Sequence, residues 1–380
     1  MPDRIDRPAM DRVLQHVVQL VDLPGAPGHE DAVARYVSDA LAPFGEVSVD
    51  VHGSVVAALG ADEAAPRLVL VAHMDEVALV VRAVEPNGFL RVAPLGSLQP
   101  ESATGRVVRV GTVLGVVGIR AGHYHVRRAA PPDHHDLYVD IGASDAEDVA
   151  LAGIVVGTPV TLAEPLQRFG RDSVWWVGHA LDNRVGVALL LTLVERLAGE
   201  VLPWRWYAAF SVQEENGLRG ASRMVAACAP DVAIALDTIA SGDTPDLEAA
   251  QDTPFRLGHG PVLPVATGTA GTGHVVPKRL LEHLEAVAAS AAVTVQRAVM
   301  THGDNDATAL TWSTPGALAA SIAVPRRYAH SAVETLHAGD VAAAYAWLEA
   351  IVRTPVSDGN ALRDPMRRGG TFRAAPEAHA

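Results

Sequence analysis

The chain has 380 residues, of which 49% are hydrophobic and 19% are charged, a composition too apolar for a disordered protein. Its 30 lysines and arginines against 44 aspartates and glutamates give a net charge of −14, which argues against nucleic acid or an anionic membrane surface as a partner. With Cys228 as its single cysteine, the chain can form neither an internal disulfide nor a thiolate-rich zinc site, so histidines and carboxylates must hold any metal.

Neither a signal peptide nor a membrane span is visible in the sequence. The first 25 residues carry charges throughout and have no apolar core followed by a small-residue cleavage site. The longest apolar stretch, residues 185–194, is far shorter than the ~20 residues that a transmembrane helix needs. We therefore expect a cytoplasmic protein, which also fits the scarcity of cysteine.

The first third of the chain begins with helical patterns and then changes period. Apolar residues recur on one face twice within residues 10–43, which predicts two helices separated by the turn PGAPGHE. Residues 47–59 predict two strands that turn at Gly53, and residues 67–72 form a continuous apolar run typical of a buried parallel strand. Residues 77–167 contain many short β-rich runs separated by glycine-containing turns, which predicts a small all-β domain.

Helix and strand patterns alternate in the rest of the chain. The predicted helices span residues 183–197, 218–227, 278–291 and 333–352, and the predicted strands span 204–212, 232–236, 294–300 and 317–324. Such alternation predicts an α/β fold with a mostly parallel sheet covered by helices on both faces. We expect residues 1–76 and 168–353 to form this domain, residues 77–167 to form the inserted β domain, and the polar tail 354–380 to be disordered.

Polar side chains follow the predicted strands where those strands end. They are His73 and Asp75 after residues 67–72, Glu214 and Glu215 after 204–212, Asp237 after 232–236, and His330 after 317–324, and Asp182 adds a further acid at the start of a helix. Because the carboxyl ends of parallel strands form the binding crevice of an open α/β sheet, we expect these side chains to converge.

Imidazoles and carboxylates in such a cluster suit two divalent ions of the zinc type, and one carboxylate can bridge them. Glu214 and Glu215 can both reach one site only where the strand ends, and Gly217 supplies the turn. One of the pair could then bind metal while the other takes a proton from the attacking water. Asp75 is placed to accept a hydrogen bond from the second ring nitrogen of His73 and so to fix its tautomer.

The order of these motifs resembles one family of enzymes. His-x-Asp, LDN, QEENGLRGA, ALD and RYAHS, together with LPGAPGHE and AHMDEVALVV, resemble the dinuclear-metal aminopeptidases of the glutamyl, deblocking and tetrahedral (TET) aminopeptidase group. The resemblance covers about residues 15–350. The separation of His73 and Asp182 by 182 − 73 = 109 positions supports it, because the carboxypeptidase-like relatives keep these ligands close together.

The resemblance implies a zinc-peptidase-like fold with an inserted barrel or PDZ-like domain, and it assigns a role to each residue. His73 and Asp237 would bind one ion, Glu215 and His330 the other, with Asp182 bridging, Glu214 as general base and Asp75 supporting His73. The ions would be zinc, with cobalt or manganese as alternatives. It also implies peptide substrates with a free N-terminus and a dodecamer assembled from dimers.

Some residues depart from the family pattern or admit other interpretations. Asn305-Asp306-Ala307 stands where relatives commonly have Thr-Asp-Ala, so Asp306 matches, Asn305 replaces the Thr, and Asp304 adds an acid before them. We interpret His123, His125, His134 and His135 as surface or interface residues, and Cys228 as a small buried residue. Arg219 could contact substrate or only pack the turn. The alternative functions are a glycan hydrolase, whose two acids would lie ~5–10 Å apart without metal, and a catalytically silent assembly protein.

Overall fold

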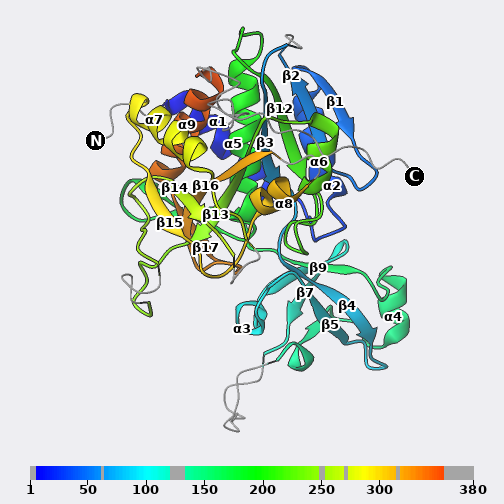
Figure 1. Cartoon of the computed structure of the whole chain (residues 1–380). Helices are drawn as coiled ribbons and strands as arrows, with labels where there is room; N and C mark the ends of the chain where they lie inside the picture. Colours follow the sequence, from blue (N-terminus) through cyan, green and yellow to red (C-terminus); the bar gives the residue numbers. More distant parts are fainter. Residues whose placement is uncertain are drawn as a thin grey trace, which may run out of the picture.

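The structure is a computed structural model that describes residues 6–60, 64–119, 133–247, 253–268, 273–313 and 317–354. Figure 1 shows an α/β body that carries most helices and the large sheet, and below it a smaller β body. Within the described ranges, no helix is long and apolar enough to cross a membrane.

The large sheet is mixed, and its centre is parallel. Its main path, in spatial order, is β1 (Glu46–Val49), β2 (Val55–Leu59), β12 (Arg205–Ser211), β3 (Arg67–His73), β13 (Val232–Ala240), β16 (Leu318–Arg327), β17 (Glu334–His337), β11 (Trp175–Gly178) and β10 (Gln167–Phe169). Strands β12, β3, β13 and β16 are parallel to one another, and antiparallel strands flank them. Off this path, β14 (Val262–Ala266) pairs with β16 and with β15 (Gln296–Val299). The predicted mixed α/β fold is confirmed.

Helices cover both faces of the sheet because the central strands are apolar on both sides. In β3, Leu68, Leu70 and Ala72 point into one core, and Val69 and Val71 point into another. The first core is covered by α1 (Arg7–Val21), α2 (Asp31–Leu41), α5 (Leu181–Leu197), α7 (Lys278–Ser290) and α9 (Ala338–Arg353). The second is covered by α6 (Ala221–Cys228) and α8 (Asp306–Trp312).

The smaller body is a closed six-stranded barrel. Its strands, in spatial order, are β4 (Ala78–Val84), β5 (Leu90–Leu95), β8 (Tyr138–Asp140), β7 (Val113–Val117), β6 (Val107–Val110) and β9 (Pro159–Leu162), and α3 (Pro100–Ala103) and α4 (Ala146–Leu151) accompany them. Closure leaves no free strand edge. Of the two forms expected for the inserted domain, a barrel or a PDZ-like fold, the structure has the barrel. Gln167, the last residue of the predicted insert, is the first residue of β10 in the large sheet.

Three predicted elements differ from the structure. Residues 334–337 belong to β17 and not to the predicted helix 333–352, because they pair antiparallel with β11, a contact that periodicity cannot reveal. Strand β13 continues to Ala240, so Asp237 lies inside the strand and not after its end. Helix α6 begins at Ala221, since Gly217 and Leu218 have positive φ angles and form a turn.

Most of the predicted tail and two of the histidines singled out in the sequence lie outside the residues that the structure describes. Thr354 follows α9 directly, and its carbonyl oxygen accepts a hydrogen bond from the Trp204 indole N–H at 3.0 Å. The disorder of the tail stays a prediction. Residues 355–380, His123 and His125 lie outside the described residues.

Candidate metal centre

The structure brings all seven predicted site residues to one region at the carboxyl edge of the parallel strands. His73 is the last residue of β3, and the two glutamates follow β12 in a turn. Asp237 comes from β13, Asp182 from the first turn of α5, and His330 from the loop between β16 and β17. The glutamate turn is closed by the Gly217 amide, which donates to the carbonyl oxygen of Glu214 at 3.0 Å.

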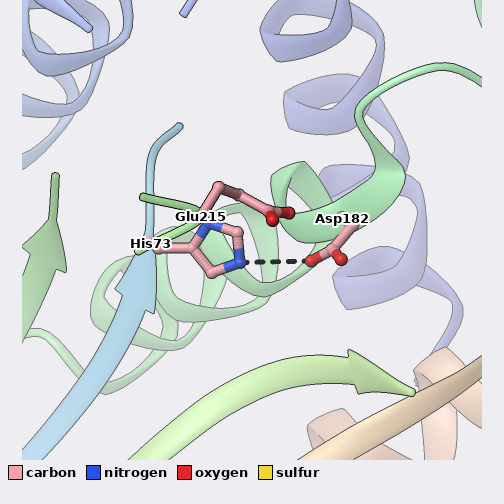
Figure 2. Close-up of side chains that lie close together, drawn as sticks. All are labelled: His73, Asp182 and Glu215. Atoms are coloured by element: carbon pink, nitrogen blue, oxygen red, sulfur yellow. Dashed lines mark hydrogen bonds and ion pairs between the residues drawn. The ribbon is translucent and has the colours of Figure 1, made fainter. Parts of the chain in front are cut away.

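Asp182 lies between the two histidines. Its Oδ1 atom is 3.1 Å from His73 Nε2, and its Oδ2 atom is 3.3 Å from His330 Nε2. Figure 2 shows the first of these contacts, with Glu215 reaching toward the same space. A carboxylate that offers one oxygen to each of two imidazoles has the arrangement expected of a bridging ligand.

Each histidine is accompanied by its own carboxylates. Asp237 Oδ1 lies 3.5 Å from His73 Nε2, and ligand atoms of His73, Glu214 and Asp237 all lie within 4.8 Å of one another. Glu215 Oε1 lies 3.2 Å from His330 Nε2. We call the first group the His73 half of the centre and the second the His330 half.

Asp75 has a different main contact from the one predicted. Its carboxylate accepts hydrogen bonds from the backbone amides of Glu214 and Glu215, both at 3.0 Å. Asp75 Oδ1 is 3.4 Å from His73 Nδ1, but that ring nitrogen forms no hydrogen bond within the part of the chain that the structure describes. Because the two amides occupy the carboxylate, the fully buried Asp75 fixes the glutamate turn more directly than it fixes the imidazole.

Burial and mutual repulsion disturb the pKa values of the acids. Burial raises the pKa of Glu214 well above its usual value, and Asp237 and Glu215 raise it further. Burial, followed by the charge of Asp182, raises the pKa of Asp237 to about 6. Burial alone would lower the pKa of His73, but the surrounding carboxylates outweigh it and hold that pKa well above the usual value. Burial and neighbouring carboxylates thus both oppose the ionisation of Glu214 and Asp237.

Two residues that the sequence analysis missed support Asp182. The Arg326 guanidinium pairs with Asp182 Oδ2 through one nitrogen and with Glu334 through another. Glu334 Oε2 accepts from the amide of Asp182, and Glu334 Oε1 accepts from the amide of His330, both at 2.9 Å. Arg326, near the end of the largely apolar strand β16, was the available signal, because such a charge is rarely buried unless it is paired.

Asp306, at the start of α8, lies below the centre. Its Oδ2 atom accepts a hydrogen bond from the Ser211 hydroxyl at 2.5 Å, while its buried Oδ1 atom has no partner. Burial raises the pKa of Asp306 to about 7. Asn305 caps α8 by accepting from the Ala307 amide, so the residue that departs from the family pattern has a structural task.

The remaining singled-out residues lie apart from the ligands. His134 Nε2 is 2.9 Å from the carbonyl oxygen of Leu98, and His135 is exposed. Arg219 donates through Nε to the carbonyl oxygen of Asn216 at 2.8 Å, as expected if it packs the turn. Cys228 is buried, and burial raises the pKa of its thiol to about 11.

The donor set fits divalent cations. It consists of imidazole nitrogens and carboxylate oxygens, the ligands that zinc, cobalt and manganese accept. Closely spaced buried acids that raise one another's pKa are a costly arrangement in the absence of compensating cations. The residues present can therefore hold metal at this position.

Comparison with known proteins identifies the family of this chain. The sequence model of the family described as M42 glutamyl aminopeptidase matches residues 53–346. The protein SgcX of Escherichia coli (strain K12) is 36% identical over 327 residues, which cover 83% of this chain and 86% of that protein. The lysyl aminopeptidase of Pyrococcus furiosus is 30% identical over 335 residues, covering 85% of this chain and 92% of that protein.

Solved structures share the fold over nearly the whole chain. The TET1 peptidase of Pyrococcus horikoshii, described as able to assemble into a tetrahedron or a large octahedral shell, matches with a TM-score of 0.79 at 26% identity, covering 90% of this chain and 99% of that one. A protein of Thermotoga maritima described as an endoglucanase matches with a TM-score of 0.71 at 26% identity, covering 89% and 96%. From the family match and the two relatives, this chain belongs to the M42 glutamyl aminopeptidase family.

Proposed function

We propose that this protein is a dinuclear metallo-aminopeptidase that removes N-terminal residues from peptides. The observation that carries the proposal is Asp182, which offers one carboxylate oxygen to His73 and the other to His330. His73 and Asp237 would hold one divalent ion, Glu215 and His330 the other, and Asp182 both. Zinc is the first candidate, with cobalt or manganese as alternatives. When bound, such ions polarise a scissile carbonyl and make water a better nucleophile.

Glu214 is the proposed general base. Its side chain is only 8% exposed and lies beside His73 and Asp237, and its backbone amide is held by Asp75. A buried carboxylate with a raised pKa accepts a proton from the attacking water readily and can then donate it to the leaving amine. Asp75 contributes by fixing the turn from which Glu214 projects.

The charge of the site supports action at a free N-terminus. Asp182, Asp237 and Glu215 surround the position where substrate would bind, and these acids attract an α-amino group. An internal peptide bond has no such group to place there. We therefore propose an exopeptidase, with peptides bearing a free N-terminus as substrates.

The barrel is proposed to serve assembly. Residues 77–167 would form the domain inserted into the catalytic parts 1–76 and 168–353, and would pair chains into dimers that build a tetrahedral dodecamer. The TET1 peptidase of Pyrococcus horikoshii, which can assemble into a tetrahedron, supports this proposal. We propose a cytoplasmic location and no nucleic-acid or membrane partner, in line with the net charge of −14.

The Glu214→Gln variant tests the proposed function. It should keep the metal content of the wild-type protein and lose about 10²–10⁴-fold in turnover of aminoacyl-nitroanilides, because the proton acceptor is gone. Metal content by elemental analysis and kcat should be measured on the same sample, with Glu164→Gln, on the chain between β9 and β10, as the matched control. A near-normal rate in Glu214→Gln would show that another group is the base.

A glycan hydrolase remains a second candidate because a structural relative is described as an endoglucanase. Paired carboxylates hydrolyse glycosidic bonds without a metal ion. That chemistry leaves His73, Asp182 and His330 without a task, which favours the aminopeptidase. Activity on a glucan that survives exhaustive chelation would establish the alternative. Absence of both activities in the metal-loaded protein would point to a silent assembly protein.

A further inference from the structure

A segment of the barrel reaches the metal centre. Residues 96–99 connect β5 with α3, and the Ser97 hydroxyl lies 2.8 Å from Nδ1 of His330. A Cβ atom on Gly96 would lie 3.3 Å from both the Cβ and the carbonyl oxygen of Glu215, and Gly96 has a φ angle of +77°. This close approach, in a left-handed conformation, suits glycine at that position. The barrel thus contacts both protein ligands of the His330 half.

The contact is anchored on both sides. On the barrel side, Leu98 is buried in the barrel core, and its carbonyl oxygen lies 2.9 Å from His134 Nε2. On the His330 side, Ala332 is fully buried in that same core, with Val333 packed against it. The loop that carries His330 therefore packs against the barrel. This packing fixes the position of that loop relative to the segment that carries Ser97.

The hydrogen bond bears directly on which nitrogen of His330 can act as a ligand. A neutral imidazole that donates through Nδ1–H has its lone pair on Nε2. His330 Nε2 is the atom that faces Asp182 Oδ2 and Glu215 Oε1, at 3.3 and 3.2 Å. A hydroxyl that accepts from Nδ1 thus selects the tautomer that a metal requires. His73 has no equivalent among the described residues, since its Nδ1 atom forms no hydrogen bond with any of them.

We propose that Ser97 is a positioning residue for His330, and that the barrel thereby sets the affinity of the His330 half for its divalent ion. The inference rests on the proposed function, since it needs ions at this centre. It makes the barrel part of the active centre in addition to its proposed role in assembly. Its direct consequence is that one of the two ions depends on Ser97 and the other does not.

Zinc titration of the metal-free, full-length protein tests this inference. The Ser97→Ala variant should bind one zinc ion about 10–100-fold more weakly than wild type and the other unchanged, the usual effect of removing a partner of a ligating histidine. Ser97→Thr, which keeps the hydroxyl, should restore the wild-type affinity. Ser144→Ala is the matched control, because Ser144 is an exposed serine of the same domain, next to α4.

The possible outcomes separate the inference from the proposed function. Selective weakening of one site in Ser97→Ala, with rescue by threonine, supports the inference, because a general loss of stability would weaken both sites. Wild-type affinity at both sites in Ser97→Ala overturns the inference and leaves the proposed function intact. A wild-type protein that binds no divalent zinc overturns both. Equal weakening of both sites also overturns the inference, since it excludes an effect confined to His330.

Discussion

The two halves of the metal centre are built in different ways. His73 ends a central strand, is 2% exposed, and has Asp237 on the neighbouring hydrogen-bonded strand β13. His330 lies in a loop, its side chain is 25% exposed, and its φ angle is 54°. A non-glycine residue in the left-handed region needs support from its surroundings. Here Glu334 accepts from the amide of His330.

The difference shows which contacts fix the geometry of the ligands in each half. The His73 half is positioned by the sheet itself, so its geometry follows from strand register. The His330 half is positioned by side-chain contacts from three directions: Ser97 in the barrel, Glu334 at the start of β17, and Arg326 through the shared Asp182. We therefore expect substitutions outside the ligand set to change the metal affinity of the His330 half more than that of the His73 half.

The largest effect is expected for Asp182→Ala, which removes the carboxylate shared by both halves. Both ions should be lost, and activity with them. Stability should also fall by about 3–5 kcal/mol, because the buried Arg326 loses one of its two carboxylate partners. Metal analysis and denaturant unfolding measure the two effects. Asp182→Asn, the shape-matched control, keeps the size of the side chain but removes its charge, and it should also lose the ions. Two retained ions in Asp182→Ala would contradict the bridging role.

Partial metal removal tests whether the halves are unequal. Dialysis of the metal-loaded protein against increasing chelator should release one ion before the other, and the more exposed His330 half should empty first. Two variants identify the halves: His330→Ala should lose the early-released ion and keep the late one, whereas His73→Ala should lose the late one. Simultaneous release of both ions from the wild-type protein would contradict the expected difference between the two halves.

Residue patterns alone predicted the His73 half better than the His330 half, for a physical reason. A continuous apolar run that ends in His-x-Asp marks a buried strand entering a polar site, so His73 can be placed from local sequence. The ligand role of His330 was implied by the family resemblance. Ser97 lies 233 positions from His330, and no local pattern announces a hydrogen bond across that separation. Arg326 and Glu334 were missed because their contacts with Asp182 also join residues that are far apart in the sequence.

The fold likewise has features that local sequence predicts and features that it does not predict. The parallel strands, the helices on both faces and the β-rich segment follow from periodicity and composition. Strand β17 was mistaken for helix because its pairing partner, β11, is distant in sequence. Asp237 was placed beyond a strand end because five apolar residues precede it, whereas β13 continues through it by pairing with β16 up to Ala240.

The next effect concerns Arg326, a fixed positive charge on a ligand oxygen of the His330 half. In Arg326→Met, the affinity of that half for its ion should rise roughly tenfold, equivalent to ~1.4 kcal/mol, because the competing cation is gone. The metal-free variant should be less stable by about 3–5 kcal/mol, since Asp182 and Glu334 lose the charge between them. Zinc titration and denaturant unfolding measure these opposite changes.

Arg327→Met is the matched control for Arg326. Arg327 lies on the same strand, pairs with Asp243 and packs over the Trp175 ring at 4.9 Å, and among the described residues it forms no ion pair with a ligand carboxylate. It should leave both zinc affinities unchanged. If the two variants changed zinc affinity equally, the effect would come from the net charge of the region and not from the contact with Asp182.

The smallest effect is expected for His134→Ala, because His134 acts on the ion only indirectly, through the segment that carries Ser97 and then through His330. His134 supports the carbonyl of Leu98, the residue after Ser97, and a hydrogen bond of this kind contributes about 0.5–1.5 kcal/mol. Because only part of that energy bears on the position of Ser97, zinc affinity of the His330 half should fall about threefold and that of the His73 half should not change. His135→Ala, at the exposed neighbouring position, should change neither. A larger loss in His134→Ala than in Ser97→Ala would show that the barrel acts through the backbone of residues 96–98 and not through the Ser97 hydroxyl.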